Sequence, residues 1–286
     1  MDVDVVSVSA LALMFVLGLR HGFDPDHIAM IDSMAYRSLE TRPKMAPWIG
    51  TWFALGHGLA VTVIAVIFGA MAGGMADAMP LPAALGALLE WLPVALLILV
   101  GTLNLRSLMQ PAPYGAIGWK TRFVPQRLRN SSHPLAIFLV GIVFALVFDT
   151  ATQAAAWGYA ASVHSGAVQA GIAMALLVGL VFTAGMVITD TLDGRLMVRM
   201  LRHLSGRSQA QAYRRKIGWI IVFLSYGIAL YAIATHFYPA LAMGETMLTL
   251  AGCALFAGLL GAYLYCVRGF PATSTFPVTN HLPSKE

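Results

Sequence analysis

Residues 5–31 read VVSVSALALMFVLGLRHGFDPDHIAMI, an apolar run that ends in a cluster of histidines and aspartates. The apolar part, Val5 to Leu19, has 15 residues, whereas a helix needs about 20 to cross the hydrocarbon of a bilayer. A span that begins here must therefore continue through the polar cluster as far as Ile31. A charged side chain at the bilayer centre costs roughly 2.5–3.5 kcal/mol, so the cluster needs a compensating partner, and a divalent cation is the simplest one.

The composition of the whole chain indicates a membrane protein. Of its 286 residues, 58% are hydrophobic and 11% are charged, whereas a soluble domain has about 25% charged residues. The formal charge of +5 does not indicate a nucleic-acid partner, because the basic residues lie in the loops between apolar runs. We therefore expect an all-α, polytopic membrane protein whose solvent is partly the lipid bilayer.

The apolar runs predict seven transmembrane helices. They cover residues 5–31, 49–72, 82–105, 134–160, 168–191, 217–238 and 246–267. Lysine and arginine are concentrated in alternate connecting loops, so the positive-inside rule places the N-terminus outside and the C-terminus in the cytoplasm. We expect one transporter domain over residues 1–270 and a disordered cytoplasmic tail over 271–286. The membrane is predicted to be a plasma membrane, the inner membrane of a bacterium.

The polar cluster of the first span has the spacing of a metal site. His21, Asp24 and His27 follow one another at three-residue intervals, which places them on one face of a helix. Pro25 should kink or break this helix, swing Asp26 toward the same face and leave the carbonyl of His21 free as a further oxygen donor. Imidazole and carboxylate together suit nickel, cobalt, zinc or iron better than calcium or magnesium.

A simpler reading of this cluster is a helix end stabilised by charge pairing. In that reading Asp24 and Asp26 pair with Arg20 and Arg37, and no metal binds. Two histidines at ligand spacing are harder to explain in this way than two aspartates.

Polar residues in three further spans predict that the site extends beyond the first helix. His57 lies between Gly56 and Gly58, so that another backbone can approach closely. Its alternative role is that of a hydrogen-bonded packing residue. The fourth span carries Asp149, Thr150 and Gln153, with Asp149 near its middle.

The fifth span ends with Asp190 and Asp193, three residues apart on one helix face. For Asp193 the alternative is a helix C-terminal cap, with Gly194 as the left-handed residue. Given the direction of each span, all these groups fall between mid-membrane and the cytoplasmic surface, where one cavity would hold them. Phe23-Asp24 and Phe148-Asp149 also occupy corresponding spans, which indicates an inverted repeat of two three-helix units plus one helix.

Taken in order, these motifs resemble the nickel/cobalt transporter family. Residues 20–28 are similar to the family motif RHAxDADHI, and Leu55-Gly56-His57-Gly58 is similar to LGHS. Residues 149–153 resemble DTATE, and residues 185–194 resemble GMxxxDTxDG. The resemblance implies a secondary permease for Ni²⁺ and/or Co²⁺. It also implies that His21, Asp24, Asp26 and His27 recognise the metal, and that His57 and the acidic residues of the fourth and fifth spans contribute to transport.

Three departures mark the chain as a short, divergent member of that family. Seven spans are predicted here, whereas the family has eight. Gln153 replaces a carboxylate, which removes one negative charge from the path of the ion. Gly22 and Pro25 replace the two alanines of the first motif, and Gly58 replaces a serine.

Two other functions are alternatives to metal uptake. A metal exporter of related architecture would often carry a histidine-rich cytoplasmic loop, whereas the loop over 106–133 has only His133. An intramembrane metalloenzyme would need a general base beside the metal, and the H-E-x-x-H motif is absent. A phosphate-binding G-x-x-x-x-G-K-[ST] sequence is also absent. We therefore expect no enzyme activity, no prosthetic group, and no requirement for an ATPase subunit.

Overall fold

In the computed structural model the described residues are 8–74, 83–111, 114, 124–146, 168–203, 207–244 and scattered positions between 247 and 264. Every regular secondary-structure element within these ranges is an α-helix or a 3-10 helix. Three of the predicted path residues, Asp149, Thr150 and Gln153, lie outside the described residues, as does the tail over 271–286.

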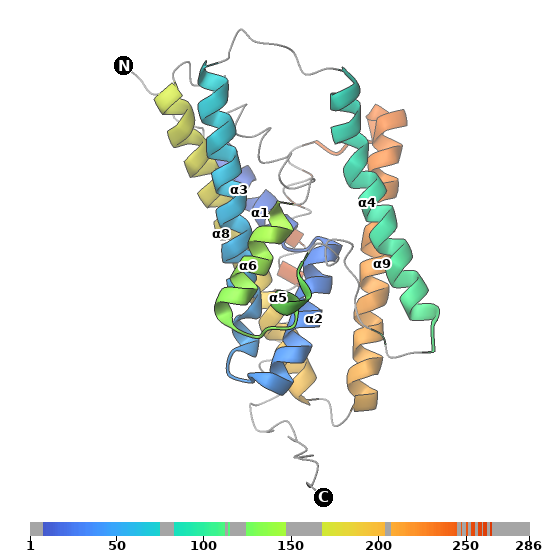
Figure 1. Cartoon of the computed structure of the whole chain (residues 1–286). Coiled ribbons are helices and arrows are strands. Elements are labelled where there is room, and N and C mark those ends of the chain that lie inside the picture. Colours follow the sequence, from blue (N-terminus) through green and yellow to red (C-terminus); the bar gives the residue numbers. More distant parts are fainter. Residues whose placement is uncertain are drawn as a thin grey trace, which may run out of the picture.

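Four of the described helices form one group, at whose centre α3 and α8 pack along each other (Figure 1). They are α1 (Val8–His21), α3 (Ile49–Gly74), α6 (Pro134–Ala145) and α8 (Val168–His203). α3 packs along both α8 and α6, and α1 packs along α8. Their shared core contains Ala54, Val61 and Phe182, which are almost completely buried.

A second group consists of α4 (Ala83–Met109) and α9 (Arg207–Phe237), which lie side by side. α2 (Pro25–Thr41) stands between the two groups and contacts α8 and α3 on one side and α9 and α4 on the other. The remaining elements are the short α5 (Gln126–Arg129), η1 (Ala46–Trp48) and η3 (Pro239–Leu241). α2 is therefore the main structural link between the two groups.

Glycines allow the helices of the first group to pack with their backbones in contact. A Cβ atom at Gly18 of α1 would collide with the carbonyl oxygen of Phe182, and one at Gly185 of α8 would collide with that of Phe15. Gly56 of α3 meets the backbone of α6 in the same way, at Phe138. Small residues at such crossings are typical of helices that pack within a membrane.

Among the residues that the structure describes, three helices are long and apolar enough to cross a membrane, over Ala46–Ala70, Gln169–Arg202 and Arg214–Phe237. Shorter apolar helices cover Leu11–His21, Val94–Met109 and Pro134–Ala145. Large apolar side chains such as Leu59 on α3 and Phe223 on α9 are exposed on the outside of the bundle. A surface of this kind suits lipid rather than water.

Two helices extend beyond the predicted ends of their spans. The fifth span was expected to end near residue 191, but α8 continues without interruption to His203. Gly194 therefore lies inside this helix, and the interpretation of Asp193 as part of a C-terminal cap is wrong. The first span, predicted over 5–31 with a break at Pro25, is divided into α1 and α2, and α2 continues beyond the predicted end to Thr41.

Candidate metal site

The site is built at the break between α1 and α2. α1 ends at His21, residues 22–24 form the turn, and α2 begins at Pro25. Proline disfavours helical geometry in the residue before it, and Asp24 accordingly has an extended backbone, with φ −60° and ψ 138°. Because a proline nitrogen carries no hydrogen, Pro25 is well suited to the first turn of the new helix. The break was thus predicted correctly.

One detail of that prediction is wrong. The carbonyl oxygen of His21 is not free, because it accepts a hydrogen bond of 2.9 Å from the backbone N–H of Asp24. The turn satisfies this carbonyl itself, so the oxygen donor that was expected from the backbone is already engaged.

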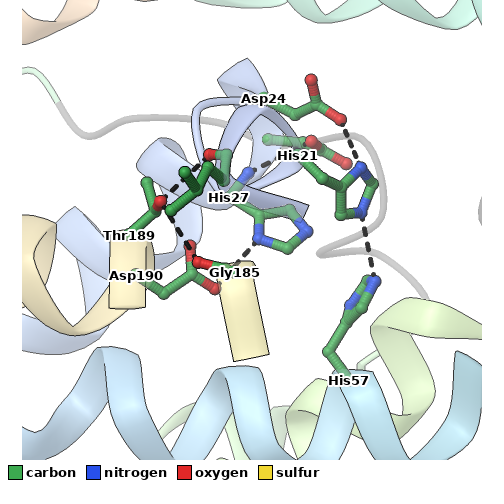
Figure 2. A network of polar contacts seen from close by, with 9 residues as sticks. His21, Asp24, His27, His57, Gly185, Thr189 and Asp190 are labelled. Carbon is green, nitrogen blue, oxygen red and sulfur yellow. Dashed lines mark hydrogen bonds and ion pairs between the residues drawn. The ribbon is translucent and has the colours of Figure 1, made fainter. Parts of the chain in front are cut away.

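Three histidines from three helices meet at this break (Figure 2). The Nε2 atoms of His21 and His57 are 3.3 Å apart, and one ring nitrogen from each of His21, His27 and His57 lies within 4.8 Å of the others. His27 and His57 are completely buried, and His21 is nearly so. Buried imidazole nitrogens that converge in this way are the usual donor set for a divalent transition metal.

Carboxylates contact the far side of two of these imidazoles. Nδ1 of His21 lies 2.8 Å from Oδ2 of Asp24, and Nδ1 of His27 lies 3.2 Å from Oδ2 of Asp190 (Figure 2). Nε2 of His27 is buried and has no hydrogen-bond partner among the described residues. In protein metal sites a carboxylate typically fixes one nitrogen of a histidine while the other nitrogen faces the metal. Asp24 and Asp190 are placed for this supporting role.

Asp190 lies within a long helix and not at the end of one. It was expected at the cytoplasmic end of its span, on the path of the ion, but α8 continues for three more turns beyond it, and its carboxylate contacts His27. The turn between α1 and α2 approaches α8 closely here. A Cβ atom at Gly22 would lie 2.8 Å from Oδ1 of Asp190 and 2.8 Å from the Cβ of Thr189. The glycine is therefore required for the contact.

The glycines beside His57 also have a steric role, as predicted. A Cβ atom at Gly58 would collide with the side chain of Thr183 on α8, and Gly56 meets α6. His57 is held at the junction of α3, α6 and α8 by these contacts. Its side chain reaches the other two histidines.

Aromatic side chains, which sequence reasoning did not identify, surround the histidines. The ring of Phe53 lies 5.1 Å from that of His27, the ring of Phe144 lies 5.6 Å from it, and the ring of Phe182 lies 5.3 Å from that of His21. Single phenylalanines in an apolar helix carry no signal that distinguishes them from lipid-facing ones. Here they exclude water, which strengthens electrostatic interactions at the site.

The predicted ligand Asp26 and the predicted path residue Asp193 are not among the three converging donors. Asp26 is nearly buried, and its Oδ1 accepts a hydrogen bond of 3.1 Å from the N–H of His27. Asp193 has a buried Oδ2 atom without a hydrogen-bond partner among the described residues.

The chain is similar in sequence to known proteins. A family model described as high-affinity nickel-transport protein matches residues 7–264. The chain belongs to this family. The nickel transporter NixA of Staphylococcus aureus is 32% identical over 206 residues, which are 65% of this chain and 60% of that protein. The cobalt transport protein NhlF of Rhodococcus rhodochrous is 30% identical over 211 residues, 65% of this chain and 58% of that protein.

A third relative in the family is the high-affinity nickel transport protein of Cupriavidus necator. It is 30% identical over 214 residues, which are 67% of this chain and 60% of that protein. The chain thus spans about three-fifths of the length of these relatives. No solved structure matches it significantly. The resemblance based on the four sequence motifs is confirmed at the level of the family.

Proposed function

We propose that this chain is a secondary permease that takes up Ni²⁺ and/or Co²⁺. The observation that carries the proposal is the convergence of His21, His27 and His57, whose donor nitrogens lie within 4.8 Å of one another inside an apolar helical bundle. Borderline nitrogen ligands of this kind select nickel, cobalt and similar ions over magnesium and calcium. Relatives named as nickel and cobalt transporters support the same class of substrate.

In this proposal the ion is bound through one nitrogen of each histidine. Asp24 and Asp190 hold His21 and His27 in the orientation that presents the other nitrogen to the ion. Asp26 adds a nearby negative charge, which lowers the cost of bringing a divalent cation into an apolar environment.

Release toward the cytoplasm would follow α8. Asp193 lies one turn beyond Asp190 on this helix and offers an oxygen without a hydrogen-bond partner among the described residues. We also assign Asp149, Thr150 and Gln153 to the path, on the strength of their sequence motif. Gln153 lacks the charge of the family carboxylate, so the path carries one fewer negative charge.

The membrane potential alone would drive such uptake. A divalent ion that moves inward gains about 4.6 kcal/mol per 100 mV, twice the value for a single charge. This corresponds to a concentration ratio of more than about a thousandfold. The sequence has no phosphate-binding loop for ATP hydrolysis by this chain. Because the membrane potential suffices for uptake, we propose that no separate ATPase subunit is required.

The proposed arrangement in the membrane has seven spans in one domain over residues 1–270. The N-terminus is outside, and the C-terminal tail is in the cytoplasm of a bacterial cell. Charge alternation between successive loops supports this orientation, and the long apolar helices α3, α8 and α9 support the multi-pass character.

Uptake of radioactive nickel into cells that express this chain tests the proposal. His21→Ala and Asp24→Ala should each abolish uptake while the protein still reaches the membrane in normal amounts. His133→Asn is the matched control, because His133 is exposed and caps α6, a role that asparagine also fills. Undiminished uptake by both site variants would refute the proposal, and competition by unlabelled cobalt would show whether the two metals share the site.

A further inference from the structure

A second buried charge cluster lies on the other side of α2, outside the histidine site. Nη2 of Arg214 on α9 lies 2.7 Å from Oδ2 of Asp32 on α2. Nε of the same guanidinium lies 3.0 Å from Oδ2 and 3.3 Å from Oδ1. Asp32 is completely buried, and Arg214 is 6% exposed. This is a two-pronged ion pair within the protein interior.

α2 holds the guanidinium group at two points. In addition to the carboxylate of Asp32, the Tyr36 ring lies beneath the guanidinium, with its centroid 4.4 Å from Cζ of Arg214. Tyr36 follows Asp32 by four residues, so both side chains lie on the same face of α2. Arginine combines two-pronged hydrogen bonding with stacking on an aromatic face, whereas lysine does not.

This pair and the metal site act on different faces of the same helix. Asp32 lies five residues after His27, which is about 140° around the axis of α2 and about 7.5 Å along it. On one face, His27 contacts Asp190 of α8. On the other face, Asp32 contacts Arg214 of α9. Any rotation of α2 that disturbs the second contact must also move His27.

Stability alone does not account for an ion pair in this position. Replacing a buried ion pair by well-packed apolar residues is often neutral or stabilising, because both charges lose their hydration. The apolar contacts of Ile28 and Ala29 with α4 and α9 hold the helices together, but hydrophobic attraction is non-directional. A guanidinium–carboxylate pair adds a fixed geometry, and thus a fixed rotation of α2.

We propose that Asp32 and Arg214 are positioning residues that set the rotation of α2 and thereby hold His27 in the metal site. The proposal rests on the proposed function, because it assigns the pair to the same histidine site. The α4–α9 group takes part in metal recognition through this contact, although it contributes none of the three converging histidines.

The test uses Co²⁺ and the purified full-length chain in detergent, because the visible absorption of bound Co²⁺ reports the number and geometry of its ligands. Asp32→Leu combined with Arg214→Leu removes both charges together and leaves no unpaired charge in the interior. We expect this double variant to fold, to bind Co²⁺ about ten- to hundredfold more weakly than the wild type, and to give an altered Co²⁺ spectrum. Binding and a spectrum equal to those of the wild type would overturn the proposal.

If the double variant does not fold, a second variant tests the positioning role of Asp32 and Arg214. Arg214→Lys keeps the charge and loses the two-pronged geometry, so we expect weaker Co²⁺ binding and an altered spectrum, with an unchanged unfolding temperature in the absence of metal. An unaltered spectrum with wild-type affinity would overturn the proposal. Lys216→Gln is the matched control, since Lys216 is exposed two residues further along α9, and it should bind as the wild type does.

The two proposals fail in different ways in this experiment. If the wild-type chain binds no Co²⁺, the histidine site and the proposed function are wrong. If the wild type binds Co²⁺ and every variant matches it, the site is correct and only the positioning role is wrong.

Discussion

Nδ1 of His27 lies 3.2 Å from Oδ2 of Asp190, although 163 residues separate the two along the chain. Both side chains are completely buried. The contact joins the start of α2 to the middle of α8, and it directs the second nitrogen of His27 toward the other histidines. An acidic residue on α8 thus contacts a histidine of another helix.

Asp190→Asn tests this contact. The amide keeps the size of the side chain but loses the negative charge that holds the imidazole, so we expect the KM for nickel uptake to rise about ten- to hundredfold. The concentration dependence of radioactive nickel uptake measures this change, with Glu40→Gln on the exposed end of α2 as the control. An unchanged KM in the variant would show that Asp190 takes no part in metal recognition.

Gly22→Ala should damage the site although it adds only one methyl group. The new Cβ atom would lie 2.8 Å from Oδ1 of Asp190, so the turn between α1 and α2 must move away from α8. Overpacking of this kind costs typically 1–3 kcal/mol. Gly227→Ala is the control, because no atom lies within 4 Å of a Cβ at that position. The unfolding temperature in detergent and the nickel uptake should both fall in the first variant and stay unchanged in the second.

The purified protein should be stabilised by nickel or cobalt and not by magnesium or calcium. A ligand present at a hundred times its dissociation constant stabilises the folded state by about 2.7 kcal/mol, which raises the unfolding temperature by several degrees. Thermal unfolding with each of the four chloride salts measures the difference. His57→Ala should lose the response to nickel and cobalt. Equal stabilisation by magnesium would contradict a nitrogen-rich site.

The predicted orientation in the membrane can be tested by cysteine labelling. The two natural cysteines, Cys253 and Cys266, are first replaced by alanine. Asp77→Cys should then react with a membrane-impermeant maleimide in intact cells, whereas Lys44→Cys should react only after the cells are opened. The reverse pattern would invert the proposed topology, and labelling of both positions in intact cells would contradict the seven-span arrangement.

The three histidines that the structure brings together are conspicuous in the sequence, each in its local context. His21 and His27 flank a proline that cannot continue the helix, and His57 has a glycine on each side. These signals are local, since they depend on backbone chemistry and on residue size. The break before Pro25 and the close approach at Gly56 and Gly58 follow from the same local rules.

The contact between Asp190 and His27 and the Asp32–Arg214 pair were not predicted, because each joins distant parts of the chain. Apolar character fades near residue 191, but backbone hydrogen bonding does not depend on it, so α8 continues to His203. Arg214 was assigned to a cytoplasmic loop by its charge. Its partner lies 182 residues away, and a single sequence carries no sign of which carboxylate a basic residue will meet.

The glycines between α1, α3, α6 and α8 have a consequence for how the ion leaves. At Gly18, Gly56 and Gly185 the backbone of one helix contacts the backbone of the next. No side chain lies between the two helices at these points, so a change of rotamer cannot alter the distance between them. We therefore expect these helices to behave as a stiff frame throughout the transport cycle. We expect the hinge to lie in the short stretch over 22–24, whose residues belong to neither neighbouring helix.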